Sequence, residues 1–280
     1  MLSDNHLKVL FYEPDSYALF NNIDIKGGVA VTYRDKNKNY GAIETFTPYE
    51  ELNSIMHKIT NDSSFAPLTD IIVTSFAYHF TKLLYEDHPE LMGRLSKGHS
   101  FDLKSNVIEK MPEIFFSEKP NDENEYVQIL GREGNERVVK YIKKQYVNDV
   151  RNLGKYKLFF SKANGTGAFG ETSSPSVIGE PNVGSTETFL SIGCFDSENE
   201  VNNTIKYIKT KFARSLLGIL KITQDVTPEK WKYVPIQNFK SDSDIGWNES
   251  ISEIDQQLYK KYNLSPEEID FIETHVKEMT

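Results

Sequence analysis

Short runs of apolar residues, several of them alternating with polar ones, predict strands in both halves of the chain. In the first half we expect a buried strand at 6–12 and another at 26–32, where Gly27–Gly28 permits a backbone that a side chain would block. Residues 29–46 are typical of a hairpin that turns at the polar segment 35–39. Two further strands are predicted in the second half, at 156–160 and 186–195.

Apolar residues three and four positions apart predict the helices. The clearest is 203–223, whose apolar face is formed by Ile205, Ile208, Phe212, Leu216, Ile219 and Leu220. Its opposite face carries bases without acids, and we expect it to be exposed: Lys206, Lys211, Arg214 and Lys221. The last predicted helix, 265–276, begins with Ser265 as its N-cap, and Glu268 completes a capping box. Other helices are expected at 47–59, 69–86, 135–146 and 252–262.

These elements predict a mixed α/β (α+β) protein in three segments. We expect the boundaries at 1–48, 49–240 and 241–280, and the last segment is predicted to be a helical C-terminal tail. Residues 163–185 are rich in Gly, Ser and Pro and are expected to form a long loop. Loops of this length in compact domains are often binding elements.

Charge is unevenly distributed along the sequence. The 280 residues carry a net charge of -9, which argues against binding of nucleic acid through bulk charge. Local basic stretches nevertheless occur: 137–162 holds eight Lys or Arg and one acid, and 201–224 holds five bases and no acid. No stretch is long and apolar enough for a membrane span, and the lone Cys194 excludes an internal disulfide. These features predict a cytoplasmic protein that does not act at a membrane.

One glycine motif invites a nucleotide-binding interpretation, but its context does not support it. Residues 165–170 spell G-x-G-x-x-G, yet the sequence ETSSP that follows cannot readily begin the helix whose N-terminus would face a pyrophosphate. We expect the glycines to let a mobile backbone approach a partner, with Ser161, Lys162, Asn164 and Thr166 supplying hydrogen bonds to phosphates or base edges. A flexible turn is the alternative explanation.

No catalytic or metal-binding residue is predicted. The six His residues lack zinc-ligand spacing, and the nearest approach to a magnesium-nuclease pattern is Asp102-Leu103-Lys104, which is more typical of a surface turn. Cys194 lies within the apolar run FLSIGCF, where a thiol usually fills a core.

Several segments resemble the C-terminal portion of N6-adenine DNA methyltransferases of type II and type IIG restriction-modification systems. The resemblance spans most of the chain and is carried by 6–10, 20–30, 160–165, 207–212 (YIKTKF), 221–226 (KITQDV), 231–239 (WKYVPIQNF) and 258–262. In that family a Rossmann-like domain binds S-adenosylmethionine through a glycine loop, and an Asn-Pro-Pro-aromatic tetrad holds the flipped adenine. Neither motif is found in this sequence, in which none of the eleven prolines follows an Asn.

The resemblance implies that 1–48 forms the last strands of a partial Rossmann-like methyltransferase edge and that 49–240 is the target-recognition domain. It implies double-stranded DNA as a partner, S-adenosylmethionine as the cofactor of the complete enzyme but not of this chain, and a catalytic methyltransferase chain or a second copy as a further partner. An incomplete sheet of this kind should leave an apolar patch. The DNA-contact residues expected are Ser161, Lys162, Asn164, Thr166, Lys206, Lys211, Arg214 and Lys221.

Two alternatives stay open. One is a restriction endonuclease with a metal-dependent carboxylate site that spacing does not reveal, which converging carboxylates would favour. The other is a protein-binding subunit that does not touch DNA.

Overall fold

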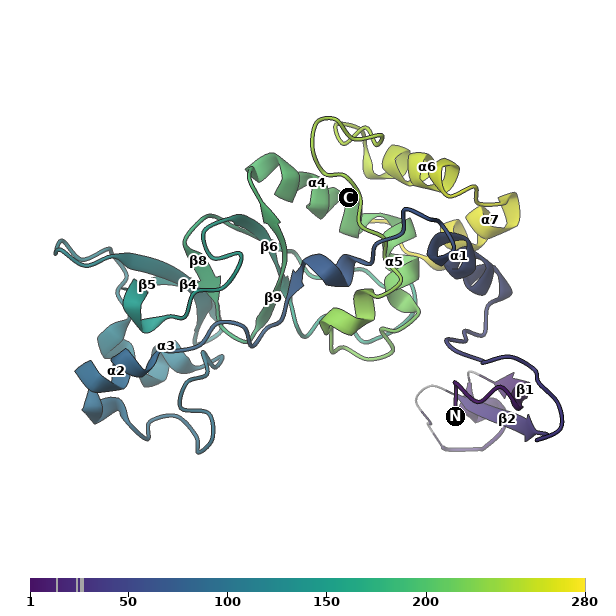
Figure 1. Cartoon of the computed structure of the whole chain (residues 1–280), viewed down its shortest axis with the longest axis horizontal. Coiled ribbons are helices and arrows are strands. Elements are labelled where there is room, and N and C mark those ends of the chain that lie inside the picture. The colour runs from purple at the N-terminus through teal and green to yellow at the C-terminus, as the bar shows by residue number, and fades with distance from the viewer. Residues whose placement is uncertain (14, 24, 26–27, 280) are drawn as a thin grey trace.

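The computed structural model describes residues 1–13, 15–23, 25 and 28–279 and shows a mixed α/β fold, as predicted. Figure 1 shows an elongated molecule with a small N-terminal lobe, a helical body and a distal sheet. The strands are β1 (Leu7–Glu13), β2 (Val29–Arg34), β3 (Ile72–Val73), β4 (Tyr126–Glu133), β5 (Glu136–Lys143), β6 (Tyr156–Ser161), β7 (Val177–Gly179), β8 (Val183–Ser185) and β9 (Phe189–Phe195). The α-helices are α1 (Glu50–Thr60), α2 (Lys82–Asp87), α3 (Val107–Lys110), α4 (Glu198–Lys209), α5 (Lys211–Gly218), α6 (Ile251–Lys261) and α7 (Pro266–His275).

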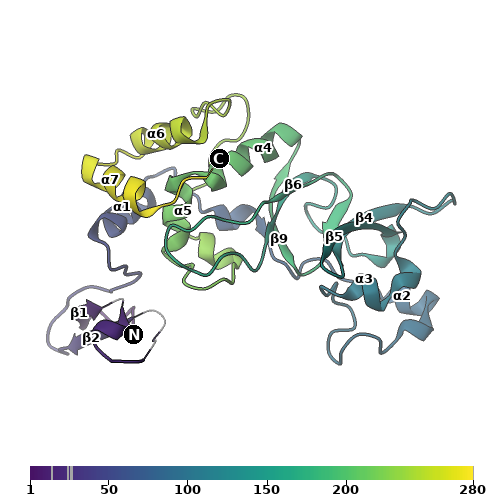
Figure 2. The ribbon, with the colours of Figure 1, turned by 180° about the vertical axis from the view of Figure 1, so that it is seen from behind.

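The N-terminal lobe is built on two antiparallel strands. Strand β2 pairs back with β1 rather than forward, so the hairpin predicted at 29–46 is wrong. The segment that follows β2 bonds to the start of the chain instead: the amide of Tyr40 donates to the carbonyl of Asn5 (2.7 Å). Residues 26 and 27, part of the second predicted strand, lie outside the described residues. Figures 1 and 2 both show the lobe set apart from the body, joined to it by the segment before α1.

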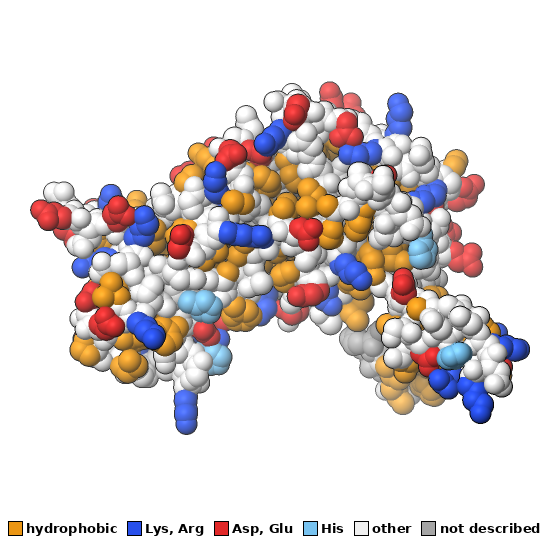
Figure 3. Space-filling view, in the orientation of Figure 1, with side chains coloured by type: hydrophobic (Ala, Val, Ile, Leu, Met, Phe, Trp, Pro, Cys, Tyr) orange, Lys and Arg blue, Asp and Glu red, His pale blue; other side chains and the backbone are white. Residues whose placement is uncertain are grey.

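The lobe has almost no interior. Leu7 is its one buried hydrophobic residue among those described, so the prediction of a buried first strand is wrong. Among the described residues, seventeen large hydrophobic ones are exposed, and twelve of these lie within residues 1–46, including Leu10, Phe11 and Val31. Figure 3 shows hydrophobic side chains on the surface of this lobe, at lower right. Exposed hydrophobic residues are therefore concentrated in this lobe.

The helical body packs against the sheet β3-β9-β6-β7. One core cluster combines residues of α1, α4 and α5 with those of the last two helices, such as Leu258 of α6 and Ile272 of α7. Helices α6 and α7 therefore share the core of the body. The capping box of Ser265 and Glu268 at the start of α7 is formed as predicted.

The distal part has a second core, beneath the sheet β5-β4-β8 and the helices α2 and α3. Strand β6 separates the two cores, because successive strand residues point to opposite faces. Leu158 and Phe160 lie in the first core and Phe159 in the second. Strand β6 thus contributes side chains to both cores.

Three helix predictions need correction. Residues 136–143 form strand β5, and 69–86 contains β3 and only a short helix, α2. The helix predicted at 203–223 is two helices that break at Thr210, whose side chain accepts from the amide of Ala213 and caps α5. No helix within the described ranges is long and apolar enough to cross a bilayer.

Candidate nucleic-acid interface

The glycine loop, residues 163–175, is held by the carboxylate of Glu171. The amides of Thr166 (2.7 Å) and Gly167 (2.9 Å) donate to it, as does the Thr166 hydroxyl (2.9 Å). Residues 171–176 form no helix, which confirms that the G-x-G-x-x-G motif lacks the context of a dinucleotide site. The loop is an ordered element folded around its own acid.

The glycines of this loop serve internal packing. A Cβ on Gly167 (φ +96°) would lie 2.4 Å from the backbone nitrogen of Thr223, and one on Gly170 (φ +69°) would lie 2.1 Å from the carbonyl oxygen of His275. Both positions also need a positive φ, which L side chains rarely adopt. The close approach is thus to this chain's own backbone, which corrects the expectation of a mobile backbone that approaches an external partner.

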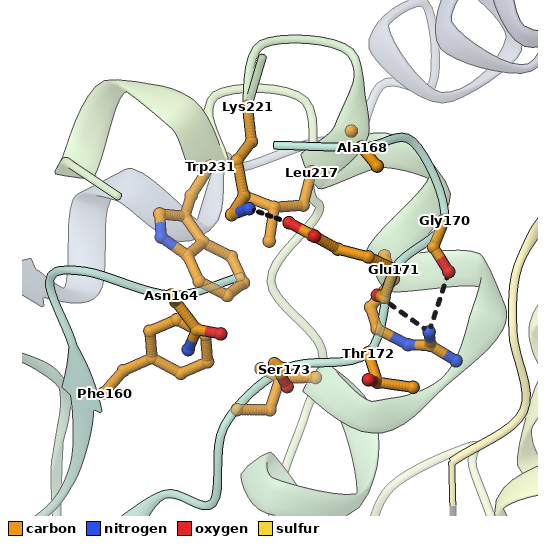
Figure 4. A pocket seen from close by; sticks show the side chains of 13 residues that line it. Phe160, Asn164, Ala168, Gly170, Glu171, Thr172, Ser173, Leu217, Lys221 and Trp231 are labelled. Carbon is orange, nitrogen blue, oxygen red and sulfur yellow. Dashed lines mark hydrogen bonds and ion pairs between the residues drawn. The ribbon is translucent and has the colours of Figure 1, made fainter. Parts of the chain in front are cut away.

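Lys221 pairs with Glu171 inside the molecule. The side chains are only 8% and 16% exposed, and the Lys221 ammonium donates to the Glu171 carboxylate. Burial alone would raise the pKa of Glu171, but the bonds from Lys221, Thr166 and Gly167 outweigh it and lower that pKa to about 2. Figure 4 shows this pair crossing the small hollow under the loop. Lys221 is therefore a support of the loop.

Arg214 is buried and fastens three segments together. Its guanidinium donates to the carbonyls of Gly170 (3.4 Å), Glu171 (3.2 Å) and Lys277, and its Nε donates to the carbonyl of Lys209 (3.0 Å). Figure 4 shows the two bonds to the loop. Burial lowers the pKa of Arg214. Because Arg214 and Lys221 are both buried, the expectation of a wholly exposed basic face is wrong.

Asn164 is also an internal residue. Its backbone amide donates to the carbonyl of Gln224 (2.8 Å), and its side-chain oxygen accepts from the backbone amide of Ser174 (2.9 Å). With Trp231 it lines the hollow of about 30 Å³ under the loop. Asn164 thus ties the two ends of the loop, while Thr166 remains exposed.

Lys206 and Lys211 lie at a groove of about 800 Å³ between the α4–α5 break and the C-terminal segment. Lys206 donates to the carbonyl of Trp247 (2.7 Å), and Lys211 pairs with Glu273 (2.5 Å). The groove is also lined by Asp255, which accepts from the amides that begin α5. Its charge is mixed, so it offers an anion less attraction than the sequence pattern indicated.

A second group of cations gathers around the end of β6. We call it the Lys162 surface and define it by Phe76, Lys104, Arg137, Ser161 and Lys162. The Lys162 ammonium lies 4.6 Å from the centre of the Phe76 ring, and Lys104 lies 5.8 Å from it. Arg137 reaches the Ser161 hydroxyl at 3.4 Å. No carboxylate of the described residues lies within ion-pairing distance of Lys162 or Arg137.

Lys104, which belongs to this surface, and Asp102, which borders it, were both singled out in the sequence. Lys104 lies 3.5 Å from Asp102 and 3.0 Å from Glu187, and Asp102 accepts from His99 at 2.7 Å. Within the described ranges, no group of three or more His, Cys, Asp or Glu residues could hold a metal ion. Cys194 is exposed, which corrects the prediction of a core thiol.

Sequence reasoning missed Glu171, Arg137 and Phe76. Arg137 lay in a segment predicted to be helical, whereas it belongs to the β4–β5 hairpin and contacts Ser161, 24 residues further along the chain. Glu171 had one local signal, its position directly after a cluster of glycines whose amides need an acceptor. Phe76 had no such signal, because an apolar residue in a turn is not part of the regular spacing of apolar residues that marks a helix or a strand.

The comparisons with known proteins are sparse. No family model matches the sequence, and no curated protein shows significant similarity to it. One of the solved structures that match is that of the type IIG restriction endonuclease BpuSI, with 10% sequence identity and a TM-score of 0.36. The match covers 89% of this chain and 36% of that chain, so the chain spans about a third of that protein's length. A TM-score of this size does not establish a common fold.

Proposed function

We propose that the chain is the sequence-selective DNA-binding portion of a restriction-modification adenine DNA methyltransferase. The observation that carries the proposal is the Lys162 surface. There Lys162 and Arg137, which pair with no carboxylate among the described residues, lie beside the Ser161 hydroxyl and the exposed Phe76 ring. Arg and Lys neutralise phosphates, and Ser and Arg can reach base edges. The sequence resemblance supports the same class of function.

The eight residues expected to contact DNA then divide into three groups. Ser161, Lys162 and Thr166 have side chains that a duplex can reach. Asn164, Arg214 and Lys221 are buried and act as positioning residues that hold the glycine loop beside β6. Lys206 and Lys211, at the groove, could meet a phosphate only by exchanging their present partners.

Duplex binding over a salt series tests the proposal. The slope of log K against log salt is negative, and each neutralised phosphate adds about 0.9 to its magnitude. The variant Arg137→Ala/Lys162→Ala should therefore reduce the magnitude of the slope by about 1.8. The matched control is Lys144→Ala, because Lys144 is exposed and already paired with Glu125. Enrichment of one sequence from a mixed pool would establish selectivity. Absence of binding at low salt, or a double variant with the wild-type slope, would refute the proposal.

The endonuclease alternative has one supporting observation. Lys104 stands between Asp102 and Glu187, which brings two carboxylates and a lysine together. Incubating the same DNA with Mg²⁺ distinguishes the two functions. Cleavage that disappears in Asp102→Asn would favour the nuclease, whereas binding without cleavage favours recognition alone.

The glycine loop does not fit S-adenosylmethionine. It closes on Thr223 and His275, and its hollow of about 30 Å³ can hold little more than a water molecule. Our proposal therefore assigns the cofactor and the catalytic residues to a polypeptide segment outside these 280 residues. The N-terminal lobe, with its exposed apolar residues and unpaired strand edges, is the surface on which we propose that this polypeptide packs. A dimer of the isolated chain in light scattering would instead indicate a second copy.

A further inference from the structure

Phe76 stands at the tip of a turn that is fixed at both ends. The amide of Ala77 donates to the carbonyl of Thr74 (3.1 Å), which closes the turn. On one side Val73 pairs with Ser191 of β9. On the other, the buried Tyr78 hydroxyl donates to Asn152 (2.9 Å). The ring is thus presented by a rigid backbone.

The Phe76 ring is 44% exposed, and single exposed apolar residues are common on protein surfaces. Its surroundings distinguish it. Two ammonium groups, of Lys162 and Lys104, lie within 6 Å of the ring centre. A hollow of about 250 Å³ adjoins it, lined by Thr74, Ser75, Leu190, Thr227 and the acidic residues Asp225 and Glu229. A flat apolar face, cations and hydrogen-bond acceptors meet at one place.

We propose that Phe76 is a stacking platform for one unpaired nucleotide of a DNA strand. The base lies on the Phe76 ring, and the ammonium groups of Lys104 and Lys162 leave the ring to pair with the flanking phosphates. The acidic residues that line the hollow can accept from an exocyclic amino group, so a base that carries one (adenine, cytosine or guanine) is preferred over thymine. A base inside an intact duplex has no free face, so the ligand is a single-stranded or extruded nucleotide. This inference rests on the proposed DNA-binding function and adds a second kind of contact to it.

Short single-stranded DNA with 2-aminopurine at its centre is the probe, because the fluorescence of this base reports stacking. The same strand annealed to its complement measures duplex affinity separately. Phe76→Ala should weaken single-strand binding about 5- to 100-fold, the range expected for loss of one aromatic stacking contact, and Phe76→Trp should restore it. The matched control is Phe46→Ala, since Phe46 is also 44% exposed. Thermal unfolding of each variant verifies folding.

The outcomes separate this inference from the proposed function. If the wild-type chain binds duplex and Phe76→Ala leaves single-strand affinity and 2-aminopurine fluorescence unchanged, the platform is refuted while the DNA-binding function stands. If the chain binds neither DNA, both fail. Competition by free deoxynucleoside monophosphates as strong as that by the strand would overturn the assignment to a strand. Loss of affinity in Phe46→Ala equal to that in Phe76→Ala would also overturn the proposal.

Discussion

Replacing Glu171 by Gln removes the negative charge around which the glycine loop is folded. The substitution preserves size but leaves the Lys221 ammonium, 8% exposed, without a counter-charge. It also leaves one acceptor oxygen for the amides of Thr166 and Gly167, which now share the carboxylate. Removing one partner of a buried ion pair typically costs about 3–5 kcal/mol. We therefore expect Glu171→Gln to lower the free energy of unfolding by about 3 kcal/mol.

The pH dependence gives an independent measure of the same interaction. The pKa of Glu171 falls from 4.5 to about 2 in the folded protein, so its stabilising contribution is complete above about pH 4.5 and is lost as pH falls toward 2. At 1.36 kcal/mol for each unit of pKa, this contribution is at most about 3 kcal/mol. The wild-type chain should lose stability over this range more steeply than Glu171→Gln does.

Urea unfolding followed by tryptophan fluorescence is the assay, since Trp231 and Trp247 both lie in the core of the helical body. The matched control is Glu125→Gln, which breaks the exposed pair with Lys144 and should leave the stability almost unchanged, because solvent screens such a pair. In Glu171→Gln/Lys221→Met, removal of both charges should recover part of the loss. A Glu171→Gln variant as stable as the wild type, or with the same dependence on acid, would refute the reasoning.

Two further predictions concern the same loop. Arg214→Met should lower the free energy of unfolding by about 3 kcal/mol or more, because it leaves buried carbonyls of the loop and the C-terminal segment without donors. Arg214→Lys should recover little of this loss. Urea unfolding measures both variants, and wild-type stability in Arg214→Met would contradict the role assigned to Arg214. Gly167→Ala should loosen the loop and speed its proteolysis, because Ala meets both a positive φ and the Thr223 backbone. Gly154→Ala, at a position with open space, is its control, and equal cleavage rates in the two variants would disprove the packing argument.

Features with local causes were predictable from the sequence. The capping box of α7, the helices α6 and α7 and the strands β6 and β9 follow from patterns within a few residues. Strand β5 was mistaken for a helix because the basic residues around it suit a helix. The hairpin that it forms with β4 turns at Gly134 and Asn135, a local signal that the helix prediction overlooked, and only the pairing of β4 with β8 joins distant segments. The break at Thr210 depends on Asp255, which caps the start of α5 from a helix 44 residues away in sequence.

The candidate site was only partly predictable, for a related reason. A basic residue on the helix face opposite an apolar stripe is exposed to solvent only if no other segment covers that face. Arg214 and Lys221 are covered by the glycine loop and by the C-terminal segment. Ser161 and Lys162 remained accessible because they end a strand rather than lie on a helix face. Burial of a charged side chain is decided by tertiary packing, which a periodicity does not contain.

The net charge of -9 is compatible with DNA binding once its distribution is considered. Residues 241–280 hold ten acidic residues and three lysines, so most of the net charge belongs to this segment, and the rest of the chain is close to neutral. Figure 1 shows α6 and α7 at the end of the molecule opposite the β4–β5 hairpin that carries Arg137. Charge interactions fade over about 8 Å at physiological salt, so the acids leave attraction at the Lys162 surface largely intact. If the proposed function is correct, a duplex is repelled at one end and held at the other, and this charge distribution would orient the molecule on DNA.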